Sequence, residues 1–452
     1  MKKGAATVLA ALVIIGFGIG FLWGSRTHHR IQIGGHWIEV NPKAVPDPRR
    51  TYTLQFWDYN LPLGSPVGVP AGGPAGGGKS GYRKYLERAV AAFQESHPNI
   101  KVEITLLDIV AGPDRLAAAL AQNNAPDVYA SAFRIPAVDY RRQIPAGMFL
   151  TPAETAEYPP ALQRLVRQDQ CLWALPRWTV PGLWIANREL LEKAGLAPDS
   201  IRATGWTWEQ LTALARRLPA GQVLLAGNPA ENGFFRQLAA NAAPVADRAS
   251  AAWNGRSVAA ALELLQQIGN VRPGSGRNLM IDQDFTASFL KGRALFLAGV
   301  RPILYPLLRP GLAARGCGGL FVPVPGRGAA GNAVVTENGV LCVYRNQRTR
   351  GEDQIAAAVK LARFLSCYRE VDPWVQMVAV PAAQSAAAVW LDKAAALIGA
   401  PEAAYLAAMV RAANLQNLGE LPEYQTQIYP ALRDFLAGKT TPTQAQALMF
   451  DH

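Results

Sequence analysis

The chain has 452 residues, of which 50% are hydrophobic and 17% are charged. This composition excludes a disordered chain, and the length leaves room for two or three compact lobes. The formal net charge is +12, but no basic run is longer than a pair such as Arg141-Arg142. Scattered cations favour a solvated basic surface over nucleic-acid binding, whereas anionic lipid headgroups and an acidic partner are left open.

An uncharged apolar stretch covers residues 4–24, directly after two lysines. Its 21 residues are about the number that a helix needs to cross a bilayer of roughly 30 Å. The stretch is longer than the apolar core of a secretory signal, and neither a small-residue cleavage site nor a lipid-attachment cysteine follows it. Residues 1–24 are therefore predicted to be a membrane signal anchor, and residues 25–50 a linker. The cations of this linker leave the orientation of the anchor open.

The elements expected after the linker alternate between strands and helices. Strands are expected over residues 51–59, 100–108, 126–131 and 338–344. Helices are expected over residues 82–98, where Pro98 stops the first helix, and over residues 114–124. This alternation is typical of a parallel α/β sheet. Residues 185–300 are richer in helix, and helices also dominate the C-terminal part.

A glycine-rich segment between the first strand and the first helix contains a phosphate-loop pattern. Gly73, four residues and then Gly78-Lys79-Ser80 fit the pattern that cradles nucleotide phosphates. In a true phosphate loop the strand runs directly into the glycines, but here about 13 residues rich in Pro and Gly intervene. Prolines in and before the motif also lack the N–H group that would bind phosphate. The match is therefore attributed to chance, and no nucleotide cofactor is predicted.

Neither a metal site nor a catalytic site is predicted. The four cysteines form no C-x-x-C pair, and the five histidines have no ligand spacing on a helix face. The cysteines could form two disulfides in an oxidising compartment or stay as free thiols. No Ser-His-Asp set suggests itself, so the chain is predicted not to be an enzyme and to need no cofactor.

From about Thr51 to the C-terminus, a series of segments follows the order of one known family. These segments are AFQESHPNIKVEI (92–104), APDVYAS (125–131), WALPRWTVPGLWIANRELLEKAGL (173–196), GWTWEQLTALARRL (205–218), FTASFLKGRALFLAG (285–299), VPVPG (322–326), VAVPAAQSA (378–386) and FLAGKTTPTQAQALM (435–449). No single segment is specific, but their order resembles that of the extracellular solute-binding proteins of bacterial ABC importers, the family that includes the maltose- and glycerol-phosphate-binding proteins. This chain departs from the family in a longer Gly/Pro insertion at residues 61–81 and in its lack of a lipid-attachment cysteine.

The resemblance implies a periplasmic-binding-protein fold, with two α/β lobes joined by hinge crossings and preceded here by one N-terminal transmembrane helix. The first lobe would comprise residues 51–177 and 338–380, and the second lobe residues 178–337 and 381–452. The membrane subunits of an importer would then recognise the state in which the lobes have closed around a ligand. Because the family is exported, residues 25–452 are expected outside the cytoplasm, in the periplasm or at the cell surface.

In such a fold the ligand lies in the cleft, beyond the carboxyl ends of the strands. Strand ends and crossings supply the candidate ligand-binding residues, namely Trp57, Asp58, Tyr59, Ser131, Phe133, Arg134, Arg177, Trp178, Thr179, Asn228, Glu231, Arg301, Glu337 and Asn338. Aromatic rings pack on the C–H faces of sugars, and Asp, Asn, Glu and Arg bind hydroxyl groups. The set therefore favours a carbohydrate ligand.

For several aromatic and polar residues, a structural role is the alternative to ligand binding. Trp57 could equally be a core residue, because only every second residue of a strand faces the same side. Trp178 could stack on a sugar or brace the hinge. Asp127 is expected to tie a strand end or to cap a turn, and Thr207 to cap a helix.

The leading functional hypothesis is the extracytoplasmic solute-binding component of an ABC importer, which delivers a sugar or oligosaccharide to the membrane permease. The alternative is a membrane-tethered sensor or scaffold that has the same fold and no transport role. The expected partners are a small-molecule ligand, ABC permease subunits and the membrane through residues 4–24, without nucleic acid.

Overall fold

A computed structural model describes residues 30–61, 63, 81–219, 221–242, 253–269, 279–280, 285–328, 333–411, 414–417 and 422–450. The predicted anchor at residues 1–24 lies outside these ranges, as do the phosphate-loop pattern and most of the Gly/Pro insertion. Within these ranges, no helix has the length and apolar character that crossing a membrane requires.

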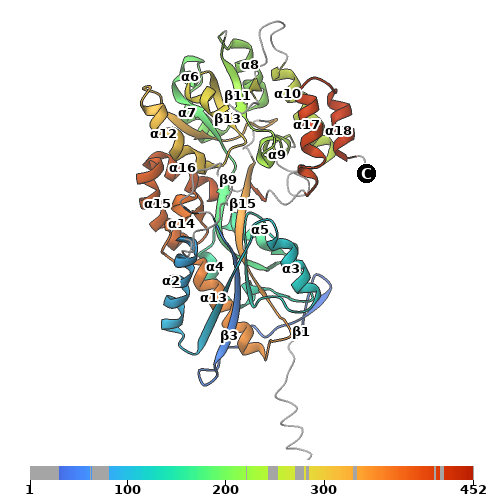
Figure 1. Ribbon diagram of the computed structural model, residues 1–452, viewed down its shortest axis with the longest axis vertical. Helices are drawn as coiled ribbons and strands as arrows, with labels where there is room; N and C mark the ends of the chain where they lie inside the picture. Colours follow the sequence, from blue (N-terminus) through green and yellow to red (C-terminus); the bar gives the residue numbers. More distant parts are fainter. Residues whose placement is uncertain are drawn as a thin grey trace, which may run out of the picture.

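An eight-stranded mixed sheet forms the centre of the first lobe, the lower one in Figure 1. Its strands run in the order β16 (Val380–Pro381), β9 (Ala174–Pro181), β15 (Val334–Tyr344), β5 (Val128–Ser131), β3 (Tyr52–Tyr59) and β4 (Ile100–Leu107), while β6 (Gln143–Ile144) and β17 (Leu415–Asn417) also pair with β15. The parallel pairing of β3 with β4 and β5 confirms the predicted start of the sheet. The whole sheet is mixed because β15 runs antiparallel to both β5 and β9.

Helices and two small hairpins surround this sheet. The helices are α2 (Gly81–Ser96), α3 (Gly112–Ala121), η1 (Ala146–Phe149), α4 (Pro152–Ala156), α5 (Pro160–Val166) and α13 (Glu352–Ser366). The hairpins are β1 (Arg30–Ile33) with β2 (His36–Glu39) and β7 (Arg167–Gln168) with β8 (Cys171–Leu172). Helix α2 buries its apolar face, from Leu86 to Phe93, as its helical spacing predicts. Asp127, just before β5, accepts hydrogen bonds from the Gln55 backbone of β3 at 2.8 Å and from the Gln354 amide of α13 at 3.0 Å, which confirms the predicted role of tying a strand end.

A five-stranded sheet forms the centre of the second lobe, the upper one in Figure 1. Its order is β12 (Leu279–Met280), β11 (Val223–Gly227), β13 (Ala294–Ala298), β10 (Trp184–Asn187) and β14 (Gly319–Val322). The surrounding helices are α6 (Arg188–Lys193), α7 (Pro198–Thr204), α8 (Trp208–Arg217), α9 (Asn232–Ala240), α10 (Gly255–Gly269), α11 (Phe285–Leu290), η3 (Pro302–Leu304), α12 (Tyr305–Ala313), η4 (Pro422–Tyr424), α17 (Ile428–Leu436) and α18 (Pro442–Phe450). Helix α8 begins with the predicted Thr207 cap, whose side chain accepts from the backbone N–H of Gln210.

The chain passes between the lobes through adjacent segments. Strand β9 leaves the first sheet at Pro181 and is followed by β10 of the second sheet, and β15 brings the chain back. The backbone N–H of Gly182 donates to the carbonyl of Val335 at 2.7 Å, so the first two crossings are in contact. A Cβ on Gly182 would lie 2.8 Å from that carbonyl, which explains the glycine there. The lobe limits predicted after residues 177 and 337 fall inside β9 and β15, because both strands continue through the first sheet.

Three helices lie between the lobes, namely α14 (Asp372–Gln376), α15 (Gln384–Ile398) and α16 (Ala400–Arg411) (Figure 1). Trp390 and Leu406 are fully buried in the core that also contains the first sheet. Glu402 forms an ion pair with Arg202 of α7 and accepts a hydrogen bond from the Phe321 backbone at 2.8 Å. Helix α15 also contacts α12 of the second lobe, so α15 and α16 contact both lobes, whereas the limits implied by the family resemblance assign them to the second.

Candidate ligand-binding site between the lobes

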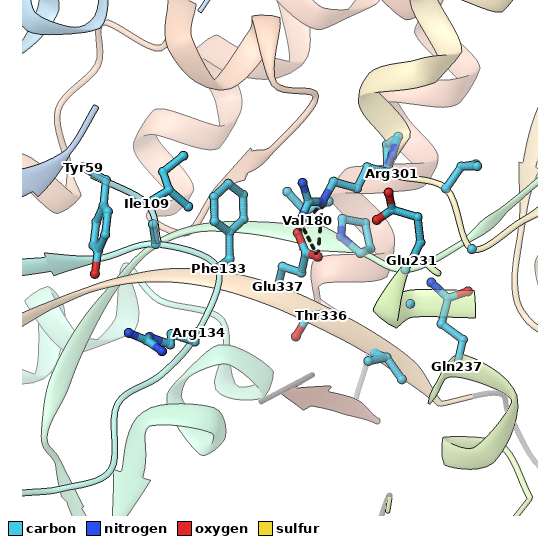
Figure 2. A pocket seen from close by; sticks show the side chains of 18 of the residues that line it. Tyr59, Ile109, Phe133, Arg134, Val180, Glu231, Gln237, Arg301, Thr336 and Glu337 are labelled. Atoms are coloured by element: carbon cyan, nitrogen blue, oxygen red, sulfur yellow. Dashed lines mark hydrogen bonds and ion pairs between the residues drawn. The ribbon is translucent and has the colours of Figure 1, made fainter. Parts of the chain in front are cut away.

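A cavity of about 460 Å³ lies where the two lobes and their crossings meet (Figure 2). The first lobe contributes residues at or just after the ends of β3, β4 and β5, and the second lobe contributes residues just after β11 and β13. Strands β9 and β15 form the wall between them. Most of these positions follow the carboxyl ends of strands, which is where α/β sheets hold their ligands.

Phe133 projects into the cavity from the turn after β5 (Figure 2). Its backbone has φ of 66°, a left-handed conformation that is strained for a bulky side chain. The hydroxyl of Ser131 donates to the carbonyl of Arg134 at 2.5 Å and holds this turn. The ring centroid of Phe133 lies 5.3 Å from that of Trp178 and 4.9 Å from the guanidinium of Arg301. Phe133 is thus the half-exposed aromatic face of the first lobe at this cavity.

Tyr59 ends β3 and contributes a buried part of the wall. Only 2% of it is exposed, and its hydroxyl hydrogen-bonds to the hydroxyl of Tyr129 at 2.6 Å. The ring packs against Gly112, where a Cβ would lie only 2.4 Å from a ring carbon. Tyr59 therefore shapes the cavity floor, and its hydroxyl already has a protein partner.

Arg301 and Glu337 form an ion pair at the edge of the cavity (Figure 2). The Nε of Arg301 lies 3.0 Å from a carboxylate oxygen of Glu337. The Arg301 side chain is 52% exposed, and that of Glu337 is 16% exposed. The Glu337 carboxylate raises the pKa of Arg301. The pair links the second lobe to crossing strand β15 and offers both a donor and an acceptor to a ligand.

Further polar groups reach the cavity from the second lobe. Glu231 lies exposed just before α9, in a turn in which the carbonyl of Asn228 accepts from the Glu231 backbone at 3.0 Å. The side chain of Asn228 accepts from the backbone of Ala230 at 3.0 Å, so Asn228 supports the turn and does not line the cavity. The Gln237 Oε1 is buried and has no hydrogen-bond partner among the described residues. It is therefore a vacant acceptor in the wall.

Asp58 and Arg177 lie behind the cavity rather than in it. The Arg177 Nη1 is 2.7 Å from the Asp58 carboxylate, and both side chains are at most 4% exposed. The hydroxyl of Tyr82 donates to the same carboxylate at 2.9 Å, and the ring of Trp374 lies 5.1 Å from the guanidinium. Burial alone would lower the pKa of Arg177, but the Asp58 carboxylate raises it above its ordinary value. The cluster is closed to solvent, which points to a structural role.

Trp178 belongs to the same buried layer. It is 1% exposed, with its ring 5.8 Å from that of Trp374. A Cβ on Gly339 would lie 2.2 Å from the indole, so the facing strand β15 leaves room for the ring only because it has glycine there. Two roles were considered for Trp178, stacking on a sugar and bracing the hinge. This geometry favours the hinge brace.

Three further predicted residues are also buried outside the cavity. Thr179 of β9 donates to the side-chain oxygen of Asn338 in β15 at 3.0 Å, and the Asn338 amide donates to Asn417 in β17 at 3.1 Å. This chain of bonds ties β9, β15 and β17 together. Trp57 belongs to the core and has the guanidinium of Arg115 5.0 Å above its ring.

The structure thus divides the fourteen predicted residues into two groups. Six line the cavity, namely Tyr59, Phe133, Arg134, Glu231, Arg301 and Glu337. Eight do not, namely Trp57, Asp58, Ser131, Arg177, Trp178, Thr179, Asn228 and Asn338.

Other lining residues escaped the prediction. Ile109, Val110 and Asp114 follow β4, and Gln237 and Thr336 come from α9 and β15. The position of Ile109 and Val110 directly after the expected strand 100–108 was a usable signal, because the same rule selected Tyr59. Gln237 has no such signal, because it lies inside a helix.

In the described part of the chain, no group of three or more His, Cys, Asp or Glu could hold a metal ion. The four cysteines, at positions 171, 317, 342 and 367, are free thiols, which decides between the two states left open above.

The cavity presents carboxylates, guanidinium groups, an amide and an aromatic ring. Such a set is suited to holding a polyhydroxylated molecule.

The two-lobed architecture with a cavity at the crossings is a periplasmic-binding-protein fold, and solved structures share it. UspC of M. tuberculosis is 19% identical with a TM-score of 0.58, and the match covers 88% of this chain and 99% of UspC. The sugar-binding protein MalE from Xanthomonas citri is 14% identical (TM-score 0.59, covering 88% and 95%). The cyclic alpha-maltosyl-1,6-maltose binding protein from Arthrobacter globiformis is 15% identical (TM-score 0.57, covering 88% and 97%).

Residues 77–255 match the family model described as bacterial extracellular solute-binding protein. Together with the shared fold, this match confirms the family resemblance that the order of segments predicts. A comparison with curated protein sequences gives no match.

Proposed function

We propose that this chain is the extracytoplasmic solute-binding component of an ABC importer and that it binds a sugar or oligosaccharide between its lobes. The observation that carries the proposal is the cavity of about 460 Å³ to which both lobes and the crossings contribute. This volume lies in the range of small-molecule sites, roughly 300–1,000 Å³. The match to the solute-binding family supports the class, and the solved sugar-binding proteins of the same fold support the carbohydrate.

The proposed contacts divide by chemistry. The ring of Phe133 offers an apolar face to the C–H groups of a sugar. Glu231 and Glu337 would accept hydrogen bonds from hydroxyl groups, while Arg134 and Arg301 would donate to sugar oxygens. These side chains come from both lobes and from a crossing strand. A sugar bound to all of them would therefore hold the lobes together. Closure of the first lobe (51–177 and 338–380) onto the second (178–337 and 381–452) would create the state that the permease recognises.

A panel of neutral sugars tests the binding proposal. A ligand at about 100 times its Kd stabilises the native state by about 2.7 kcal/mol, which raises the melting temperature by several degrees. We expect at least one mono- or oligosaccharide to produce such a shift in the full chain and a smaller one in Glu231→Gln. Unchanged melting temperatures across the panel would argue against a sugar site.

We further propose that residues 4–24 tether the chain to the cytoplasmic membrane, with the lobes outside the cytoplasm. The support is the uncharged 21-residue stretch together with the extracellular family. Protease added to spheroplasts should degrade the lobes, and the undigested chain should sediment with membranes. Protection from protease or release as a soluble protein would overturn the tether without affecting the sugar proposal.

A further inference from the structure

A second hollow, larger than the cleft cavity, lies on the first lobe along helix α13. It measures about 840 Å³ and shares no lining residue with the cleft cavity. We call it the α13 groove and define it by the segments 42–45, 149–154 and 356–370, with His97 at one end. Sugar binding in the cleft cavity therefore does not explain why this groove exists.

The floor of the α13 groove is the side of helix α13 that is turned away from the sheet. Ile355, Leu361 and Leu365 are buried against the sheet, as expected for a helix that covers it. The face along the groove carries Phe364 between the cations Lys360 and Arg363, and the buried Val359 closes the floor beneath them. The groove face of α13 therefore combines an apolar floor with exposed cations.

The walls of the groove continue this apolar surface. Phe149 and Leu150 at the end of η1 form one side, and the N-terminal segment 42–45 forms the other. Val45 in that segment is 70% exposed, one of the most exposed large apolar side chains among the described residues. The groove is therefore an open apolar trough.

The charges around the trough are unbalanced. Both carboxylates in the lining already have cationic partners, because Arg363 pairs with Glu154 at 2.8 Å and Arg88 pairs with Glu370. In contrast, the side chains of Lys43, Lys360 and Arg369 are exposed at the groove and form no hydrogen bond or ion pair with any described residue.

We propose that the α13 groove is a second ligand site and that it binds an anionic amphiphile, an acyl chain with a carboxylate or phosphate head group. The acyl chain would cover Val45, Phe149 and Phe364, which removes apolar surface from water. The head group would pair with Lys360 and Arg369, two cations without a protein partner. This ligand class satisfies both the apolar trough and its excess positive charge, whereas a neutral sugar would satisfy neither.

The half-buried thiol of Cys367 gives a direct probe, because it lines the groove. Burial raises the pKa of this thiol, so alkylation should be followed at mildly alkaline pH. The full chain in phosphatidylcholine nanodiscs would be treated with N-ethylmaleimide, and mass spectrometry would report the labelling of each cysteine. The added amphiphiles would be lauroyl-lysophosphatidylglycerol, laurate and, as the zwitterionic control with the same chain, lauroyl-lysophosphatidylcholine.

Both anionic amphiphiles should slow the labelling of Cys367 several-fold, while Cys171 and Cys317 keep their rates. Protection by the lysophospholipid alone would assign the site to a phospholipid head, and protection by laurate as well would assign it to acyl anions in general. Equal protection by the zwitterionic lipid, or slowing at all three cysteines, would overturn the proposal. So would the absence of protection, the result expected if the groove instead docks an acidic protein segment.

A charge reversal isolates the head-group contacts. In Lys360→Glu/Arg369→Glu the apparent affinity for the anionic amphiphiles should fall by about tenfold, with an unchanged melting temperature. The control Lys193→Glu/Arg293→Glu makes the same charge change at exposed sites of the second lobe and should keep full protection. Full protection in the groove variant, or its loss in the control, would contradict the assignment.

Discussion

Two arginine–carboxylate pairs lie close to the crossings, alike in geometry and opposite in environment. Arg177 and Asp58 are 2.7 Å apart with at most 4% of either side chain exposed, whereas Arg301 and Glu337 are 3.0 Å apart with Arg301 52% exposed. The buried pair already satisfies its charge inside the first lobe. Arg301 of the open pair can turn to a ligand at little cost, because water has access to its side chain. Environment, rather than residue type, therefore separates structural positions from candidate ligand-binding positions in this protein.

The largest expected effect comes from removing the cation of the buried pair. Arg177→Met leaves the Asp58 carboxylate buried without a counter-ion, and the free energy of unfolding should fall by about 3–5 kcal/mol. Chemical denaturation measures this change. The matched control is Lys393→Gln, which breaks an exposed pair with Asp372 of the same 2.7 Å length and should cost less than about 1 kcal/mol. An equal loss in the free energy of unfolding for the two variants would contradict the distinction between the two environments.

Truncation of the buried ring should have a comparable effect on stability. Trp178→Ala removes a fully buried indole and should lower the free energy of unfolding by about 3–5 kcal/mol. The affinity of the folded fraction for a sugar should change little, because Trp178 does not line the cavity. Gly339→Ala, which forces a Cβ against the same ring, should also destabilise the chain. A stable Trp178→Ala variant that has lost affinity would show that the ring contacts the ligand after all.

Substitution in the open pair should instead weaken sugar binding and leave the stability of the chain nearly unchanged. Arg301→Gln should weaken sugar binding by about tenfold to a hundredfold, the effect of losing a hydrogen bond to a charged group. The free energy of unfolding of the ligand-free chain should change by less than about 1 kcal/mol. Calorimetric titration beside thermal melts separates the two quantities. Arg309→Gln on the neighbouring helix α12 lies outside the cavity and should leave affinity unchanged.

The smallest expected effect concerns the strained turn at the cavity. Both Phe133→Gly and Phe133→Ala remove the ring, but only glycine accepts a φ of 66° without strain. The glycine variant should therefore be more stable than the alanine variant by about 1 kcal/mol, while both lose sugar affinity to the same degree. Denaturation curves of the two variants give the difference. An alanine variant as stable as the glycine variant would mean that the turn relaxes in solution.

The fold of the first lobe was the most predictable part of the molecule. The expected strand 51–59 corresponds to β3 at Tyr52–Tyr59, and the expected helix before Pro98 corresponds to α2. These segments have strong periodicity and a clear stop signal. In contrast, the strand expected at 338–344 begins at Val334 in β15, and α15 and α16 contact both lobes. Such packing depends on contacts between segments far apart in the chain, which local patterns do not encode.

The candidate site was predictable in its location and only partly in its residues. The rule that ligands lie beyond strand ends selected Tyr59, Phe133 and Glu231, which line the cavity. It could not reject Arg177, because the partner that buries it, Asp58, lies 119 residues earlier in the chain. Sequence patterns indicate where a strand ends, but the environment of each side chain is set by the packing of distant segments.

A crystal structure of the full chain with the sugar that gives the largest thermal shift tests the central claim most directly. We predict the sugar between the ring of Phe133 and the Arg301–Glu337 pair, with Glu231 in hydrogen-bonding contact and with Arg177 and Trp178 still buried behind the wall. A sugar bound against Arg177 or Trp178, or at a place outside this cavity, would contradict the assignment.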